Sequence, residues 1–111
     1  MPVSVIIPAY NAARFIDASL RSLVAERDAV DLDIIVIDDG STDETRRIVE
    51  RRASEFDEIR LLQNPRKGIA AARNTGLDNL PDGVRYVAFL DADDVSFPGR
   101  IARQRARLER E

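Results

Sequence analysis

The 111-residue sequence contains no cysteine and no histidine, and these two absences narrow the chemistry that it can perform. Without cysteine, the chain can form neither a disulfide framework nor a thiolate metal site. Without histidine, it lacks the commonest general base and any serine–histidine pair. Acid–base chemistry would therefore use carboxylates, tyrosine or lysine, and Lys67 is the only lysine.

Long apolar runs and an excess of positive charge are also missing. No stretch is apolar over the roughly 20 residues that a membrane-spanning helix needs, and the N-terminus lacks the basic-then-apolar pattern of a signal peptide. The formal net charge of −3 argues against a general nucleic-acid binder. Aromatic residues are too few for an evident base-stacking surface. We therefore expect a cytoplasmic protein that binds no nucleic acid.

Hydrophobic residues make up 44% of the chain and charged residues 33%, the balance of one ordinary globular domain. Short β-rich runs alternate four times with segments of helical periodicity. Asn11 is expected to cap the first helix, and Ser41 with Glu44 resembles a capping box for the second. The predicted strands are 3–7, 32–37, 59–62 and 86–90, and the later helices begin at Gly68 and near Pro98.

This alternation predicts an α/β fold in which right-handed crossovers connect the strands of a mainly parallel, Rossmann-like sheet. We expect a three-layer sandwich with strand order 3-2-1-4. The first, second and fourth strands are nearly continuous apolar runs, which fits burial on both faces. Ligands of such sheets bind beyond the carboxyl ends of the strands. Polar clusters follow three strands there, at 8–11, 38–41 and 91–94.

The cluster at 91–94 contains three carboxylates directly after an apolar strand. Aspartate is disfavoured in strands and costly to bury unpaired, so these side chains must face water, a metal or positive charge. Asp91 and Asp93 are two residues apart and would point the same way in an extended chain. Such a pair suits a hard divalent cation that also takes phosphate oxygens. A polar turn before a helix cap explains the pattern equally well.

The other clusters offer groups that could contact a nucleotide. A turn with a helix cap explains Gly40 and Ser41 but does not require two aspartates before them. The carboxylate at 38 or 39 could accept from a uracil imide or a ribose hydroxyl, and Tyr10 could lie against a base. Arg73 could neutralise a carboxylate or hold a phosphate. Neither G-x-G-x-x-G nor G-K-[ST] is present, which disfavours dinucleotide-binding and P-loop domains.

Four segments together resemble the family-2 inverting glycosyltransferases, which have the GT-A fold. They are VSVIIPAYN at 3–11, IVIDDGSTD at 35–43, GIAAARNTG at 68–76 and FLDADD at 89–94. Each motif is weak alone, but their order and spacing match the family over the whole chain. The resemblance implies a nucleotide-diphosphate sugar as donor, usually a UDP-sugar, together with Mg²⁺ or Mn²⁺.

The resemblance also implies roles for individual residues. Asp39 would bind uracil, Arg73 would support the base or the phosphates, and Asp93 would ligate the metal that bridges the diphosphate. Asp91 would meet the ribose or the metal shell. The implied nucleotide-binding set is Pro8, Ala9, Tyr10, Asn11, Asp39, Gly68, Arg73, Asp91 and Ala92, and the metal set is Asp93 and Asp91.

Inverting sugar transfer needs a cation at the departing diphosphate and a base at the acceptor hydroxyl. In this family the base is a carboxylate on a later segment, so we expect it beyond Glu111. Residues 1–111 are accordingly expected to be the nucleotide-sugar-binding portion of a C-terminally truncated GT-A domain, unable to transfer sugar alone. The acceptor, saccharide or lipid, stays open, as do the sugar and the choice of Mg²⁺ or Mn²⁺.

The last helix and the sheet edge suggest further partners. Arg103, Arg107 and Arg110 share one helix face. A solvated face is the simplest interpretation, and contact with the rest of the enzyme or with anionic lipid headgroups is the alternative. The protein could therefore work at the cytoplasmic face of a membrane. An unpaired edge next to the fourth strand would favour dimerisation.

Three other functions compete with this interpretation. Asp91 to Val95 satisfies the D-x-D-x-[TV] motif of haloacid-dehalogenase-like phosphotransferases, although that motif normally opens the domain. A receiver domain expects an acid pair after the first strand, where Pro8, Ala9 and Tyr10 stand here. A nucleotide-binding module without catalytic activity remains the third alternative.

Overall fold

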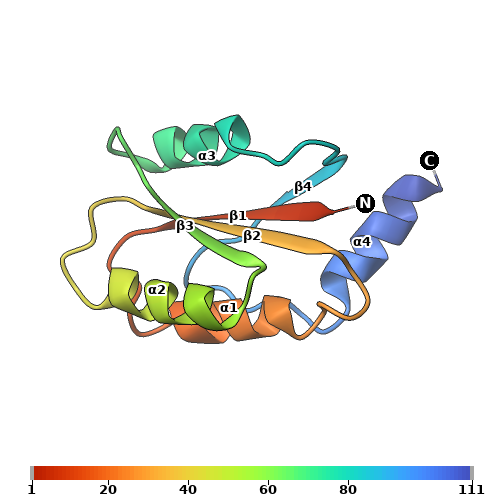
Figure 1. Cartoon of the computed structure of the whole chain (residues 1–111), viewed down its shortest axis with the longest axis horizontal. Helices are drawn as coiled ribbons and strands as arrows, with labels where there is room; N and C mark the ends of the chain where they lie inside the picture. The colour runs from red at the N-terminus through yellow and green to blue at the C-terminus, as the bar shows by residue number, and fades with distance from the viewer. Residues whose placement is uncertain (1, 111) are drawn as a thin grey trace.

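The computed structural model describes residues 2–110 and shows strands alternating with helices four times (Figure 1). All strand pairings are parallel, and the order in the sheet is β3-β2-β1-β4. The predicted fold class and strand order are thus confirmed. The elements are β1 (Val3–Ala9), α1 (Ile16–Val24), β2 (Leu32–Asp38), α2 (Thr45–Glu55), β3 (Ile59–Gln63), α3 (Ile69–Asp78), β4 (Tyr86–Phe89) and α4 (Arg100–Glu109).

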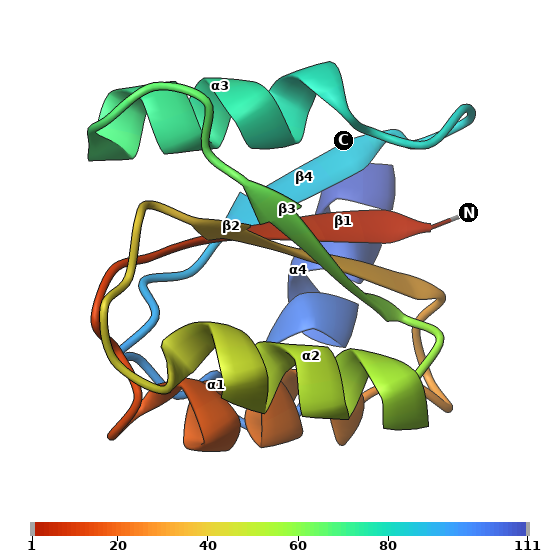
Figure 2. The ribbon, with the colours of Figure 1, turned by 60° about the vertical axis from the view of Figure 1, so that its left-hand side comes forward.

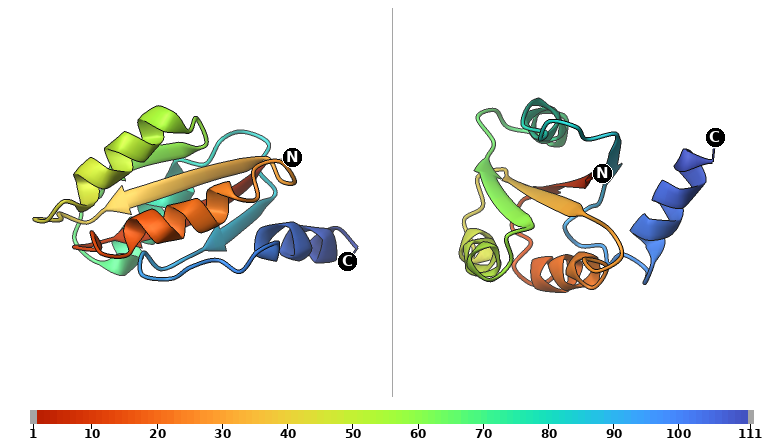
Figure 3. Two further views of the ribbon diagram at one scale, coloured as in Figure 1. Left: turned by 90° about the horizontal axis from the view of Figure 1, so that it is seen from below. Right: turned by 45° about the vertical axis from the view of Figure 1, so that its right-hand side comes forward.

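The sheet separates two helical layers (Figure 2). α1 and α2 cover one face, and α3 covers the other. Because side chains alternate along a strand, Val5 and Ile7 of β1 enter the larger core cluster while Ile6 enters the smaller one, with Ala72 of α3. α4 stands apart from both layers (Figure 3). Only Ile101 of α4 is fully buried among its residues.

β4 is less buried than its apolar sequence predicts. It was expected to be covered on both faces like β1 and β2, but its residues are half-buried and Phe89 is 42% exposed. The physical reason is that β4 is an edge strand, paired only with residues 3–6 of β1. The strand also ends at Phe89 and not at Leu90, although the Leu90 N–H still donates to the Ile6 carbonyl at 3.1 Å.

β1 runs through Pro8 to Ala9, two residues further than predicted. The Ile6 carbonyl accepts from Leu90, and the Ala9 carbonyl accepts from the Asp39 N–H. Backbone groups of β1 therefore alternate between its two neighbours, which turns Pro8 toward the side where β4 has already ended. The missing N–H of Pro8 costs no sheet hydrogen bond there.

Two predicted helix caps are wrong. α1 begins at Ile16 with Phe15 at the N-cap position, and α2 begins at Thr45 with Glu44 at the N-cap position. Asn11 and Ser41 instead connect the loops that follow β1 and β2. The Ser41 Oγ accepts from the Asn11 N–H at 3.0 Å, and the Asn11 Oδ1 accepts from the Thr42 N–H at 2.8 Å. Asn11 and Ser41 therefore form hydrogen bonds between the two loops and do not cap the helices that follow.

The third helix begins as predicted, since Gly68 precedes α3 with a φ of 111°. Small residues pack this helix close to the sheet, but the buried positions are Ala72 and Gly76. A Cβ on Gly76 would lie 2.7 Å from the Cγ2 of Ile6. Gly76, expected only to weaken the last turn, thus allows the helix to approach β1. The last helix begins at Arg100, after Gly99 with a φ of 76°, and Pro98 lies in the preceding turn.

Within residues 2–110, every helix is too short or too polar to cross a membrane.

Candidate functional site

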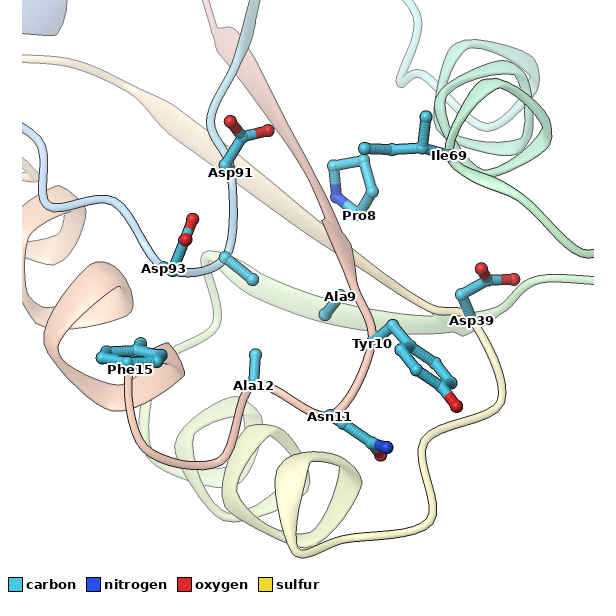
Figure 4. Close-up of a pocket in the computed structure, with 11 residues that line it drawn as sticks. Pro8, Ala9, Tyr10, Asn11, Ala12, Phe15, Asp39, Ile69, Asp91 and Asp93 are labelled. Atoms are coloured by element: carbon cyan, nitrogen blue, oxygen red, sulfur yellow. The ribbon is translucent and has the colours of Figure 1, made fainter.

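The loops that follow β1, β2 and β4 surround a cavity of about 470 Å³ at one edge of the sheet (Figure 4). This volume is in the range of small-molecule sites. Its position beyond the carboxyl ends of parallel strands is where ligands of open α/β sheets bind. The lining residues are Pro8, Ala9, Tyr10, Asn11, Ala12, Phe15, Asp39, Ile69, Asp91, Ala92 and Asp93.

Most of the residues proposed from the sequence meet in this cavity. The nucleotide set contributes Pro8, Ala9, Tyr10, Asn11, Asp39, Asp91 and Ala92, and the metal set contributes Asp93 with Asp91. Gly68 and Arg73 lie outside the lining. Three lining residues were missed: Ala12, Phe15 and Ile69. Ala12 and Ile69 directly follow predicted residues, so their positions could have been inferred. Phe15 has no predicted neighbour, and the sequence does not reveal that its side chain is 46% exposed.

Three carboxylates gather after β4. Asp91, Asp93 and Asp94 are all exposed, and each offers an oxygen within 4.8 Å of the others. A turn brings them together, since the Asp94 N–H donates to the Asp91 carbonyl at 2.9 Å. The segment is thus not the extended chain assumed for the Asp91–Asp93 pair, and the turn adds Asp94 to the group. Carboxylates at this spacing repel one another and favour a bound hard cation.

On the far side of the cavity, Asp39 is held by two donors before any ligand binds. Its carboxylate accepts from the Gly68 N–H at 3.2 Å and from the Asn64 side-chain amide at 2.8 Å. A carboxylate has acceptor capacity beyond these bonds. Asp38 has a different role: it is 2% exposed, and it accepts from the Ser41 N–H at 3.3 Å. The family resemblance named Asp39 and not Asp38, and Asp39 is the one of the two that lines the cavity.

Arg73 lies beside the three carboxylates. Its Nη2 is 4.0 Å from the Asp91 Oδ1, and its guanidinium carbon is 5.6 Å from the centroid of the Phe89 ring. Its Nε is buried and has no hydrogen-bond partner within residues 2–110. The guanidinium therefore offsets part of the negative charge around Asp91. Its support of a base or phosphate stays a prediction.

The wall formed by the loop after β1 is fixed by the loop after β2. The Ala12 N–H donates to the Thr45 Oγ1 at 2.8 Å, and the Ala13 N–H donates to the Asp43 Oδ2 at 3.2 Å. The Thr45 hydroxyl and N–H also donate to Asp43, and these bonds hold the pKa of Asp43 below its ordinary value. The segment 39–43 thus serves two purposes: Asp39 faces the cavity, and Ser41 to Asp43 hold its wall.

Comparisons with known proteins identify the family and support the fold. An uncharacterized glycosyltransferase of Escherichia coli K12, YibD, is 41% identical over 96 residues, which are 86% of this chain and 27% of YibD. The crystal structure of S. aureus TarS in complex with UDP-GlcNAc has a TM-score of 0.84 at 28% identity, over 99% of this chain and 32% of that one. The mannosyltransferase PcManGT of Pyrobaculum calidifontis, in complex with GDP-Man and Mn²⁺, has a TM-score of 0.73 at 34% identity, over 88% of this chain and 29% of that one.

This chain therefore spans about a third or less of the length of these proteins. The family model described as "Glycosyl transferase family 2" matches residues 4–111. Because that match covers nearly the whole chain, it excludes the haloacid-dehalogenase and receiver alternatives. The chain belongs to glycosyl transferase family 2.

Proposed function

We propose that residues 1–111 form the donor-binding part of a glycosyltransferase that takes a nucleotide-diphosphate sugar, preferably a UDP-sugar, with Mg²⁺ or Mn²⁺. The observation that carries this proposal is the arrangement of one cavity. Asp39 lies at one side of it and the aspartates after β4 lie at the other, with Pro8 and Ala9 between them (Figure 4). A nucleoside held at Asp39 would extend its diphosphate toward Asp91 and Asp93.

The nucleoside end is built to hold a planar base. Tyr10 is 60% exposed and Ile69 is 54% exposed, and both line the same cavity as Asp39 (Figure 4). Exposed apolar side chains that line a cavity are typical of ligand-binding sites, because a bound ligand removes their surface from water. The Asp39 carboxylate would accept from the imide N–H of uracil. The crystallised relatives bind UDP-GlcNAc and GDP-Man respectively, so we expect the base preference to be partial.

The diphosphate end is built to hold a cation. Asp93 would be its direct ligand, with Asp91 as a ribose or outer contact and Asp94 near enough to assist. A bound Mg²⁺ or Mn²⁺ would supply Lewis-acid stabilisation of the departing diphosphate. Arg73, beside Asp91, would keep that carboxylate oriented and add positive charge. Mn²⁺ in the relative PcManGT supports this assignment.

Transfer with inversion requires a base at the acceptor hydroxyl. The carboxylates that line the cavity are already assigned to the nucleobase and the cation. We therefore propose that a carboxylate beyond Glu111 deprotonates the acceptor. The acceptor saccharide or lipid would bind there as well. Dimerisation at the β4 edge and a cytoplasmic location stay predictions.

Calorimetry with UDP, in the presence and absence of Mn²⁺, tests the proposal on the 111-residue chain. We expect Mn²⁺ to strengthen UDP binding by about tenfold or more, which corresponds to ~1.4 kcal/mol. Asp93→Asn should abolish this gain. Asp94→Asn should weaken binding less. Asp82→Asn is the matched control, because Asp82 is an exposed aspartate in the turn before β4. Undiminished Mn²⁺-dependent binding by both Asp93→Asn and Asp94→Asn would contradict the metal assignment.

A further inference from the structure

The segment from Ala92 to Ala102 lies against the first helix and is held there by polar side chains. Ser19 and Ser22 of α1, and Glu26 in the turn that continues α1, face this segment at helical spacing. We name Ser19, Ser22 and Glu26 the α1 polar face. The segment includes Asp93 and Asp94 and the start of α4, so the polar face connects the helix to the carboxylates of the site.

Ser19 contacts the backbone on both sides of Asp93. Its side chain is fully buried, and its Oγ donates to the Ala92 carbonyl at 2.8 Å. The Asp94 carbonyl is a second acceptor of the same hydroxyl. A hydroxyl has one hydrogen, so the two carbonyls share it in a three-centre bond. One buried side chain thus fixes the peptide before Asp93 and the peptide after Asp94.

Ser22 and Glu26 hold the far end of the segment. The Ser22 Oγ accepts from the Ser96 N–H at 2.9 Å and donates to the Ser19 carbonyl at 2.6 Å. The Glu26 carboxylate is 5% exposed and accepts from the N–H groups of Ile101 and Ala102, at 3.2 and 3.1 Å. The backbone N–H groups in the first turn of a helix have no acceptor within the helix, and Gly99 has no side chain that could accept from those of α4. Glu26 therefore caps α4 from outside the helix.

The carboxylates themselves give the turn little support. Asp91, Asp93 and Asp94 are exposed and repel one another at distances within 4.8 Å. The turn's own bond, from the Asp94 N–H to the Asp91 carbonyl, spans three residues only. Buried bonds from a rigid helix are what hold such a group in one geometry before a cation binds.

We propose that Ser19 is a positioning residue that presets Asp93 and its neighbours for the divalent cation, while Ser22 and Glu26 fix the rest of the segment. This inference deepens the proposed function and rests on it. Ser19 is buried outside the lining of the cavity, so it would act through the backbone of the aspartate turn. Partners of this kind typically change metal affinity by about 10–100-fold when they are removed.

The test compares Ser19→Ala with the parent in two titrations of the 111-residue chain. One measures Mn²⁺ binding in the presence of UDP by the electron paramagnetic resonance signal of free Mn²⁺. The other measures UDP binding without metal by calorimetry. We expect Ser19→Ala to weaken Mn²⁺ binding about tenfold or more, and to leave metal-free UDP binding unchanged within about twofold, because Asp39 and its partners are untouched.

Ser54→Ala is the matched control. Like Ser19, Ser54 is a helix serine whose Oγ donates to a backbone carbonyl, but its partner is Arg51 of the same helix at 2.6 Å, and it lies on the exposed surface of α2. It should change neither titration. Ser19→Cys keeps a side chain of similar size with a weaker donor, so its Mn²⁺ affinity should fall between those of the parent and Ser19→Ala. It also replaces Ser19→Ala if that variant does not fold.

Two results would overturn the inference. Unchanged Mn²⁺ affinity in folded Ser19→Ala would show that the turn holds its geometry without the hydroxyl. An equal loss of Mn²⁺ affinity and of metal-free UDP affinity would show that Ser19 only stabilises the fold. Failure of the proposed function looks different, because the parent chain itself would then bind no Mn²⁺ with UDP, and the inference would fall with it.

Discussion

In the proposed function, Asp39 is the residue that recognises the nucleobase. Its carboxylate is oriented by Gly68 and Asn64, so no ordering of the side chain opposes ligand binding. We expect Asp39→Ala to weaken UDP binding by about 1.5–3 kcal/mol, the cost of one hydrogen bond to a charged group. Calorimetry of UDP binding measures this change, with Asp28→Ala as control, because Asp28 is an exposed aspartate remote from the cavity.

Guanine also carries N–H donors that a carboxylate accepts. The same variant should therefore lose affinity for GDP, and the parent should bind both nucleotides with a modest preference for UDP. Should Asp39→Ala bind UDP as tightly as the parent, the carboxylate would serve only to join Asn64 and Gly68.

Asn11 shows why residue roles are harder to predict than elements. Asn11 was predicted as a nucleotide-binding residue and lines the cavity, but the local capping pattern also predicted that it caps a helix, which it does not. Its real partners, Ser41 and Thr42, are 30 and 31 residues away in the chain. Its φ of 47° is a left-handed conformation that asparagine tolerates better than most residues. No pattern within a few residues can reveal a bond that forms only after two loops meet.

Elements were predicted better because each depends on its own residues. The alternation of β-rich and helical segments, together with the polar clusters at three strand ends, led to the prediction of the parallel sheet and its strand order, which the structure confirms. Burial of β4 was predicted wrongly, because it depends on what covers an edge strand and not on the apolarity of residues 86–90. The aspartate segment was expected to be extended for a similar reason: it contacts Ser19 of α1, and the sequence of the segment does not reveal that contact.

The hydrogen bonds of Asp43 at the start of α2 should affect how stability depends on pH in acid. Hydrogen bonds from the Thr45 hydroxyl and N–H hold the pKa of Asp43 below its ordinary value of 3.8. The unfolded state therefore binds a proton at Asp43 before the folded state does. The stabilisation is fully present above the unfolded pKa and is lost as the pH falls through the lower folded pKa. We expect Asp43→Asn to flatten the acid part of the stability curve.

Urea unfolding between about pH 2 and pH 6 measures this effect. The flattening should be partial, because Arg52 also lowers the pKa of Asp17, which keeps contributing in the same pH range. Asp82→Asn should leave the shape of the curve unchanged. Parallel curves for Asp43→Asn and the parent would show that the bonds of Asp43 contribute nothing to the pH dependence.

At the scale of the whole molecule, the site and the basic helix lie on different parts of the surface. The cavity opens at the carboxyl edge of the sheet, and α4 stands apart from the helical layers (Figures 3 and 4). The start of α4 is held by Ile101 in the core and by Glu26 at its N–H groups, and further along the helix Arg105 donates to the Ala29 carbonyl at 3.4 Å. A partner could therefore bind the rest of α4 without covering the cavity.

The exposed arginines of α4 give the last prediction. Arg103, Arg107 and Arg110 share a face and are exposed, and a basic residue near an anionic lipid surface contributes about 1 kcal/mol. We expect the chain to co-sediment with vesicles of phosphatidylserine and phosphatidylcholine at low salt. Binding should be weak, because the net charge is −3, and it should be lost at high salt. Changing the three arginines to glutamine should abolish it.

The control changes Arg46, Arg47 and Arg51 of α2 to glutamine. That triple variant loses the same charge, but two of its arginines already pair with Glu50 and Glu44 on their own helix. It should therefore keep more binding than the α4 variant if lipids contact α4. An equal loss in both variants would mean that net charge alone governs the interaction. Retention of binding by the α4 variant would assign the arginine face to solvent or to another part of the enzyme.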